Sequence, residues 1–62
     1  MTHHARIGDM VELRGGPHAF VLTDMRRAFA GMWCTFQRVD VGITRRCYET
    51  DITGIVARAV EA

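Results

Sequence analysis

The sequence predicts a mainly β fold: a small, strongly bent antiparallel sheet of four to five strands with a short C-terminal helix. Two observations predict it. Apolar and polar residues alternate early in the chain, and β-branched and aromatic residues dominate the segments after a Gly-Gly-Pro sequence at residues 15–17. The 62 residues carry no repeat or composition break, so we expect one domain, residues 1–62, with residues 1–5 flexible.

The first strand is predicted at residues 7–14. Its apolar positions on one face are Ile7, Val11 and Leu13. The structural turn that ends it consists of Gly15, Gly16 and Pro17. Glycine permits positive φ and proline lacks an N–H, so this turn breaks the strand and reverses the chain. Residues 18–25, rich in strand-forming side chains, then complete a β-hairpin.

The middle of the chain predicts a second hairpin. Residues 26–31 form a wider connection, followed by strands at residues 32–39 and 43–49. Asp and Gly in the loop between these strands favour a hairpin turn. A loop of two or four residues opposes Cys34 to Cys47 and Trp33 to Tyr48, whereas a loop of three breaks both pairings.

In the last segment the spacing of the apolar residues changes from alternating to helical. Its apolar residues recur at helical spacing, namely Ile52, Ile55, Val56, Ala59 and Val60. Thr50 can cap the N-terminus of a helix and Asp51 suits its first turn, so we expect a short helix, although Gly54 weakens it. The alternative is a fifth strand at residues 55–60 that closes the sheet.

Two sequence segments carry a family resemblance. Residues 7–13 (Ile-Gly-Asp-Met-Val-Glu-Leu), followed by the turn at residues 15–17, resemble the opening of the YodC-like family of small bacterial proteins. Residues 33–36 (Trp-Cys-Thr-Phe) resemble its Trp-Cys-x-Trp-Phe segment. The chain departs from the family at Arg14, where Lys-Ser is common, and at Phe36. The resemblance implies an SH3-like small barrel and brings no catalytic residue; this fold also occurs in modules that bind RNA or protein.

Composition argues against several classes of function. The formal net charge of +1 lacks the basic excess of most nucleic-acid modules. No apolar run approaches the roughly 20 residues of a membrane span, and no secretory signal is visible, so we expect a cytoplasmic protein. Two cysteines do not make a disulfide scaffold, and a reducing cytoplasm favours free core thiols. The alternative is a disulfide between Cys34 and Cys47.

Chemistry-bearing residues are present but poorly spaced for a site. The potential metal ligands are His3, His4, His18, Cys34 and Cys47. They form neither Cys-x-x-Cys nor His-x-x-x-His, so we expect no metal and no cofactor. Catalysis would need Cys34, His18 and Asp24 to meet, which nothing in their spacing requires. We therefore expect a protein that is not an enzyme, with a metal- or thiol-dependent protein as a remote alternative.

Binding is the better supported prediction. If Cys34 and Phe36 face the core, their strand neighbours face outward. The candidate binding residues are Trp33, Thr35, Gln37, Arg46 and Tyr48, with Arg26 and Arg27 as a basic addition. The alternative is that Trp33 is itself the largest core residue. Trp, Tyr and Arg dominate binding hot spots. We expect a protein-interaction or regulatory module with a protein partner, self-association included, and an RNA or single-stranded DNA binder as the alternative.

Overall fold

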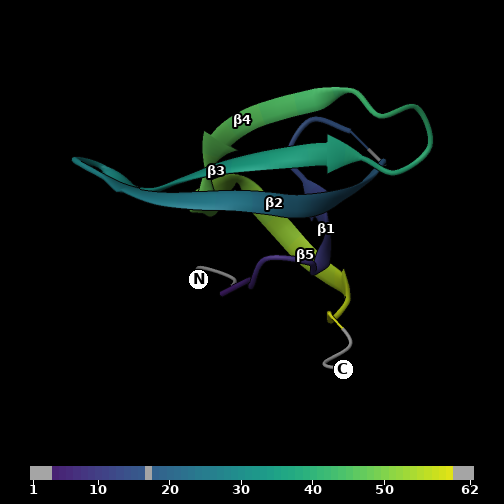
Figure 1. Ribbon diagram of the computed structural model, residues 1–62, viewed down its shortest axis with the longest axis horizontal. Helices are drawn as coiled ribbons and strands as arrows, with labels where there is room; N and C mark the ends of the chain where they lie inside the picture. The colour runs from purple at the N-terminus through teal and green to yellow at the C-terminus, as the bar shows by residue number, and fades with distance from the viewer. Residues whose placement is uncertain (1–3, 17, 60–62) are drawn as a thin grey trace.

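The computed structural model describes residues 4–16 and 18–59. Its elements are β1 (Met10–Leu13), β2 (Ala19–Ala28), β3 (Gly31–Arg38), β4 (Thr44–Tyr48), the 3-10 turn η1 (Glu49–Asp51) and β5 (Ile52–Ala57). The strands form one antiparallel sheet in the order β4-β3-β2-β1-β5, which is open between β4 and β5. β2, β3 and β4 run lengthwise along the molecule, while β1 and β5 are steeply inclined to them (Figure 1). The mainly β prediction is confirmed.

The core lies on one face of this sheet. Its buried apolar side chains are Ala5, Val11, Leu13, Phe20, Leu22, Cys34, Phe36, Cys47 and Ile52. The core residues of β1, β2 and β3 alternate along each strand, because successive side chains of a strand point to opposite faces, while β4 and β5 contribute Cys47 and Ile52. Of residues 1–5, expected to be flexible, residues 1–3 lie outside the described residues, His4 is exposed and Ala5 belongs to this core. The opposite face of β2, β3 and β4 is consequently left for other contacts.

The first strand is shorter than predicted. β1 starts at Met10, because Gly8 adopts φ +98° and turns the chain just before it. Ile7 is thereby directed away from the core and is 58% exposed, whereas Val11 and Leu13 are buried as expected. Gly15 has φ +96°, which agrees with the turn predicted there; Pro17 lies outside the described residues.

The wide connection predicted at residues 26–31 is wrong. β2 continues through Ala28 and pairs with β3 until Ala28 lies opposite Gly31. Phe29 and Ala30 then make a two-residue turn, in which Phe29 is fully exposed. Arg26 and Arg27 instead lie opposite Trp33 and Met32 in the ladder with β3, so this segment is regular strand and not a connection.

β2 contains a bulge at Thr23. The register with β3 shifts between Leu22, opposite Phe36, and Asp24, opposite Thr35. Thr23 is the extra residue, and its hydroxyl donates to the carbonyl of Thr35 at 3.1 Å. Side chains beyond the bulge therefore point to the face opposite the one that simple alternation assigns them.

The predicted register of the second hairpin is confirmed. Cys34 lies opposite Cys47 and Trp33 opposite Tyr48. The N–H of Arg38 donates to the carbonyl of Ile43 at 2.8 Å, so the loop between them has the four residues that this register needs.

The predicted C-terminal helix is wrong. Within the described residues the helical structure consists of η1, and residues 52–57 form the strand β5. The alternative of a fifth strand at residues 55–60 is therefore closer to the structure, although β5 begins earlier in the chain. β5 pairs with β1 through two register shifts. These shifts place Ile52 opposite Leu13 and Ile55 opposite Val11. The two inward residues of β5 are therefore three positions apart, whereas a regular strand would have them two apart, and this spacing resembles that of a helix.

Candidate binding face

The outer face of β2, β3 and β4 collects most of the candidate binding residues. Trp33, Thr35 and Gln37 lie on β3, on the face opposite the buried Cys34 and Phe36. The remaining members are Arg46 opposite Thr35, Tyr48 opposite Trp33 on one side, and Arg26 opposite Trp33 on the other. We call this set, together with Asp24, the outer face. Three neighbouring strands therefore hold it on a rigid backbone.

An aromatic pair marks one end of this face. The rings of Trp33 and Tyr48 meet edge to face, with centroids 4.9 Å apart and planes at 74°. Trp33 is 36% exposed, so it is not a core residue, and part of its surface faces solvent. The two residues are directly opposed on adjacent strands, which brings their side chains into contact. The pair is a preformed apolar platform.

Charge surrounds the aromatic pair unevenly. A hollow of about 310 Å³ is lined by Asp24, Arg26, Trp33, Thr35 and Arg46. Arg26 Nε lies 3.3 Å from Asp24 Oδ2, in an ion pair whose side chains are both largely exposed. Within the described residues Arg46 makes no ion pair of this kind. The guanidinium of Arg46 is thus the less compensated positive charge at the hollow.

Arg27 does not belong to the outer face. It follows Arg26 in a strand, so its side chain points to the other face, where it lies opposite Met32. There it lines a second hollow, of about 510 Å³, with Phe29, Met32 and others. Arg45 is separated from Arg46 in the same way, and its Nη2 donates to the carbonyl of Arg14 at 2.9 Å. Each arginine pair in the sequence is split between the two faces.

Both cysteines lie beneath the outer face as free thiols. Cys34 is fully buried and Cys47 is 8% exposed. Burial raises the pKa of Cys34 to about 11 and also raises the pKa of Cys47. Both thiols are consequently protonated near neutral pH, and a protonated thiol is a poor nucleophile and metal ligand. Their chemistry is that of small apolar core residues.

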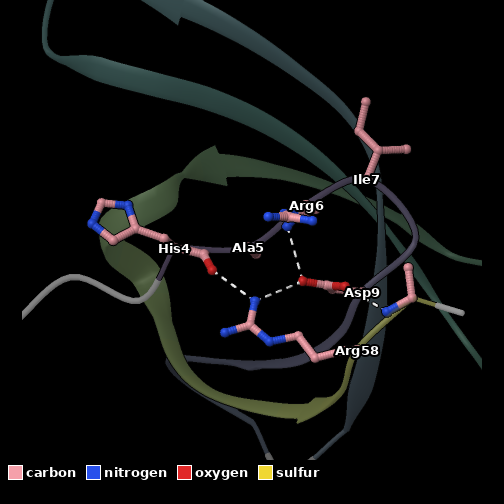
Figure 2. Close-up of a pocket in the computed structure, with 7 residues that line it drawn as sticks. His4, Ala5, Arg6, Ile7, Asp9 and Arg58 are labelled. Carbon is pink, nitrogen blue, oxygen red and sulfur yellow. Dashed lines mark hydrogen bonds and ion pairs between the residues drawn. The ribbon is translucent and has the colours of Figure 1, made fainter. Parts of the chain in front are cut away.

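A separate polar cluster joins the two ends of the described chain. The buried carboxylate of Asp9 accepts hydrogen bonds from the N–H of Arg6 (2.9 Å), the N–H of Ala59 (2.6 Å) and Arg58 Nη1 (3.0 Å). Figure 2 shows this carboxylate between Arg6 and Arg58, whose Nη1 also donates to the carbonyl of His4 at 2.9 Å. The hydrogen bond from Arg6, followed by those from Ala59 and Arg58, lowers the pKa of Asp9 against the opposing effect of burial. We call this cluster the Asp9 clamp.

The Asp9 clamp borders a hollow of about 660 Å³, also lined by Ala5 and Ile7. The carboxylate of Asp9 already accepts three hydrogen bonds from the protein, so it has little capacity left to bind a ligand. The clamp holds the segment before β1 against the segment after β5. We interpret it as a structural device.

The sequence did not indicate that Asp24 belongs to the outer face or that Asp9 forms a clamp. Asp24 was considered only for catalysis, although the spacing of Leu22 and Met25, three apart with two polar residues between them, is the signal of a bulge. Asp9 appears in the sequence only as part of the segment 7–13 that resembles the YodC-like opening. No local pattern connects it to Arg58, 49 positions later in the chain.

Comparison with protein-family models, curated proteins and solved structures finds no match. Among residues 4–16 and 18–59, no three His, Cys, Asp or Glu side chains gather in a group that could hold a metal ion. That part of the chain also contains no helix with the length and apolar character needed to cross a membrane.

Proposed function

We propose that this chain is a non-enzymatic binding module that docks a protein partner on its outer face. The observation that carries the proposal is the Trp33–Tyr48 pair, in which Trp33 is 36% exposed and lines a hollow together with Arg26 and Arg46. Trp, Tyr and Arg supply most of the energy in protein interfaces, because they combine large apolar area with directed hydrogen bonds. A rigid sheet also loses little conformational freedom when it binds.

The same face indicates the chemistry of the partner. Arg26 is partly neutralised by Asp24, which leaves Arg46 to attract a carboxylate. Guanidinium groups bind carboxylates in a two-pronged geometry that a lysine cannot offer. A partner segment with an acidic side chain near Arg46 and an apolar one against Trp33 complements this surface. A regulatory or inhibitory role is one form that such docking takes.

Binding of RNA or single-stranded DNA is the second candidate. Exposed aromatic rings stack on bases and arginines contact phosphates, so Trp33, Tyr48 and Arg46 support it. Asp24 within the hollow and the formal net charge of +1 favour a protein partner instead. The strand order and the 3-10 turn before β5 are compatible with an SH3-like module related to the YodC-like family, and we include this relationship in the proposal. Free thiols at Cys34 and Cys47 support a cytoplasmic location.

Affinity capture with cross-linking from a native lysate tests the protein partner. Trp33→Ala and Arg46→Glu are compared with Arg27→Glu, which makes the same charge change on the opposite face of the sheet. We expect a partner that is captured by the wild type and by Arg27→Glu but lost from both outer-face variants. Equal capture by all variants, or by none, contradicts the proposal.

Fluorescence anisotropy with labelled single-stranded RNA and DNA at low salt tests the second candidate. Phosphate contacts release counterions, so affinity that falls steeply with salt and disappears in Arg46→Glu indicates a nucleic-acid module. We expect no such binding. Its presence, with no protein captured, replaces the first candidate with the second.

A further inference from the structure

We propose that the free edge of β4 accepts an extended acidic peptide as a sixth strand of the sheet. This inference rests on the proposed function and adds the conformation of the partner segment and the atoms that hold it. Addition of a strand to a sheet edge is a recurrent mode of peptide recognition, in which backbone hydrogen bonds supply affinity and alternate side chains supply specificity.

The outer side of β4 is open. β4 stands at one end of the strand order, and among the described residues its ladder is with β3 on the other side. That ladder is regular from Trp33–Tyr48 to Gln37–Thr44, without a register shift. A regular edge of this kind offers a row of unpaired N–H and C=O groups to another strand.

The hydrogen-bond alternation identifies the groups at this edge. The N–H of Arg38 donates to the carbonyl of Ile43, so residues 38 and 43 are a hydrogen-bonded pair. In an antiparallel ladder such pairs alternate with non-bonded pairs. The backbone groups of Arg45 and Cys47 therefore turn toward β3. Those that turn to the free edge belong to Thr44, Arg46 and Tyr48.

These same three residues place their side chains on the outer face. Thr44, Arg46 and Tyr48 lie opposite Gln37, Thr35 and Trp33. An added antiparallel strand consequently bonds to the backbone of Arg46 and presents a side chain beside its guanidinium at the same position. A glutamate there meets the positive charge, and its neighbours two positions away reach Thr44 and Tyr48.

Charge distinguishes a foreign acidic strand from a second copy of this chain. Antiparallel pairing of two β4 edges centred on Arg46 or on Arg45 places that arginine directly opposite the same arginine of the second copy, and directly opposed like charges destabilise a sheet. The other edge, β5, carries two register shifts along its ladder with β1, and such irregularities twist an edge away from pairing. β4 is therefore the edge suited to a partner, and the partner that complements it is acidic.

The probe is a blocked eight-residue peptide of alternating Val and Glu. Two further versions carry one N-methyl group each, on a central Glu or on a central Val. If Glu faces Arg46, the Glu N–H donates to β4 and the Val N–H points away from it. We expect N-methyl-Glu to weaken binding about fivefold, the loss of about one hydrogen bond, and N-methyl-Val to bind as the parent peptide does.

Thr44→Pro tests the same bonds from the side of the protein. The Thr44 N–H takes no part in the ladder with β3, and proline is tolerated on edge strands where the missing N–H faces solvent. Thr44→Val is the reference, because it changes the side chain and keeps the N–H. We expect Thr44→Pro to bind the parent peptide about fivefold more weakly than Thr44→Val, with an unchanged circular dichroism spectrum. Amide exchange at Arg46 and Tyr48 slows when the peptide binds the wild type.

The outcomes separate this inference from the proposed function. Peptide binding that is lost in Arg46→Glu but indifferent to N-methyl-Glu and Thr44→Pro overturns strand addition and leaves docking on the outer face intact. Absence of peptide binding at millimolar concentration also overturns strand addition, whereas lysate capture tests outer-face docking independently. Binding of single-stranded RNA in place of the peptide overturns both.

Discussion

The Asp9 clamp and the outer face contain similar side chains, but the clamp uses them to stabilise the fold and the outer face leaves them available for binding. Each contains a carboxylate and arginines, yet Asp9 is 1% exposed and bonded to Arg6, Ala59 and Arg58, whereas Asp24 on the outer face lies with Arg26 in solvent. A buried carboxylate with its acceptors filled contributes to stability. An exposed ion pair contributes little, so its groups are available for exchange with a partner.

The contrast shows how a chain of 62 residues divides its polar groups. A core of this size supplies only about 3–5 kcal/mol, so one well-bonded buried carboxylate is a large fraction of total stability. Substitutions in the Asp9 clamp should therefore change the free energy of unfolding, whereas substitutions on the outer face should change binding. The following predictions test this division, from the largest expected effect to the smallest.

Removal of the Asp9 carboxylate should have the largest effect. Asp9→Ala leaves the N–H groups of Arg6 and Ala59 without their acceptor, and we expect a loss of about 3 kcal/mol in the free energy of unfolding. Urea denaturation followed by tryptophan fluorescence measures it. Arg58→Ala removes an exposed donor and should lose only about 1 kcal/mol. Equal losses in the two variants would show that the carboxylate is not the centre of the clamp.

Acid should weaken the clamp through the same group. The pKa of Asp9 is lower in the folded chain than its ordinary value, because the ionised carboxylate accepts hydrogen bonds from Arg6, Ala59 and Arg58. Its contribution to stability is fully present above the unfolded pKa of about 3.9 and is lost as pH falls through the folded pKa. The carboxyl ¹³C shift of Asp9, followed by NMR from pH 6 to pH 2, reports this pKa directly. A midpoint at or above the unfolded value contradicts the prediction.

Gly8→Ala should destabilise the clamp by about 1–2 kcal/mol. Gly8 has φ +98°, and a Cβ at this position would lie 3.0 Å from the Cβ of Ala59. Gly54→Ala is the matched control, since a Cβ there meets nothing within 4 Å. Thermal unfolding of the two variants compares them, and a control as unstable as Gly8→Ala would refute the local explanation.

Arg46→Glu should have the smallest effect on stability, within about 0.5 kcal/mol, because its side chain is exposed and makes no ion pair within the described residues. Its effect on partner capture should be complete under the same conditions. A loss of stability as large as that of Asp9→Ala would instead make Arg46 a structural residue and would remove a main support for the outer face.

The sequence predicts the second hairpin most accurately. Cys34 and Phe36 alternate with Trp33 and Thr35, and the four-residue loop leaves one consistent register with β4, so both local signals agree. The outer face follows from that register. Local pattern is sufficient here because each pairing is decided by residues close in the chain.

The sequence misleads where the ladder is irregular. Two register shifts space Ile52 and Ile55 as a helix would, and the bulge at Thr23 exchanges the faces of Arg26 and Arg27. A prediction that assumes strict alternation of inward and outward residues detects neither effect. The Asp9 clamp is invisible for another reason, because it depends on where the chain ends meet after folding.

The bulge at Thr23 also governs how this chain should be aligned with other sequences. Thr23 is supernumerary: its deletion would leave Leu22 opposite Phe36 and Asp24 opposite Thr35. A one-residue gap between chains with and without the bulge therefore belongs at Thr23, not in the hairpin turn. A gap placed in the turn between β2 and β3 would equate Arg26 of the outer face with the residue that corresponds to Arg27, and apparent conservation would then be assigned to the wrong side of the sheet.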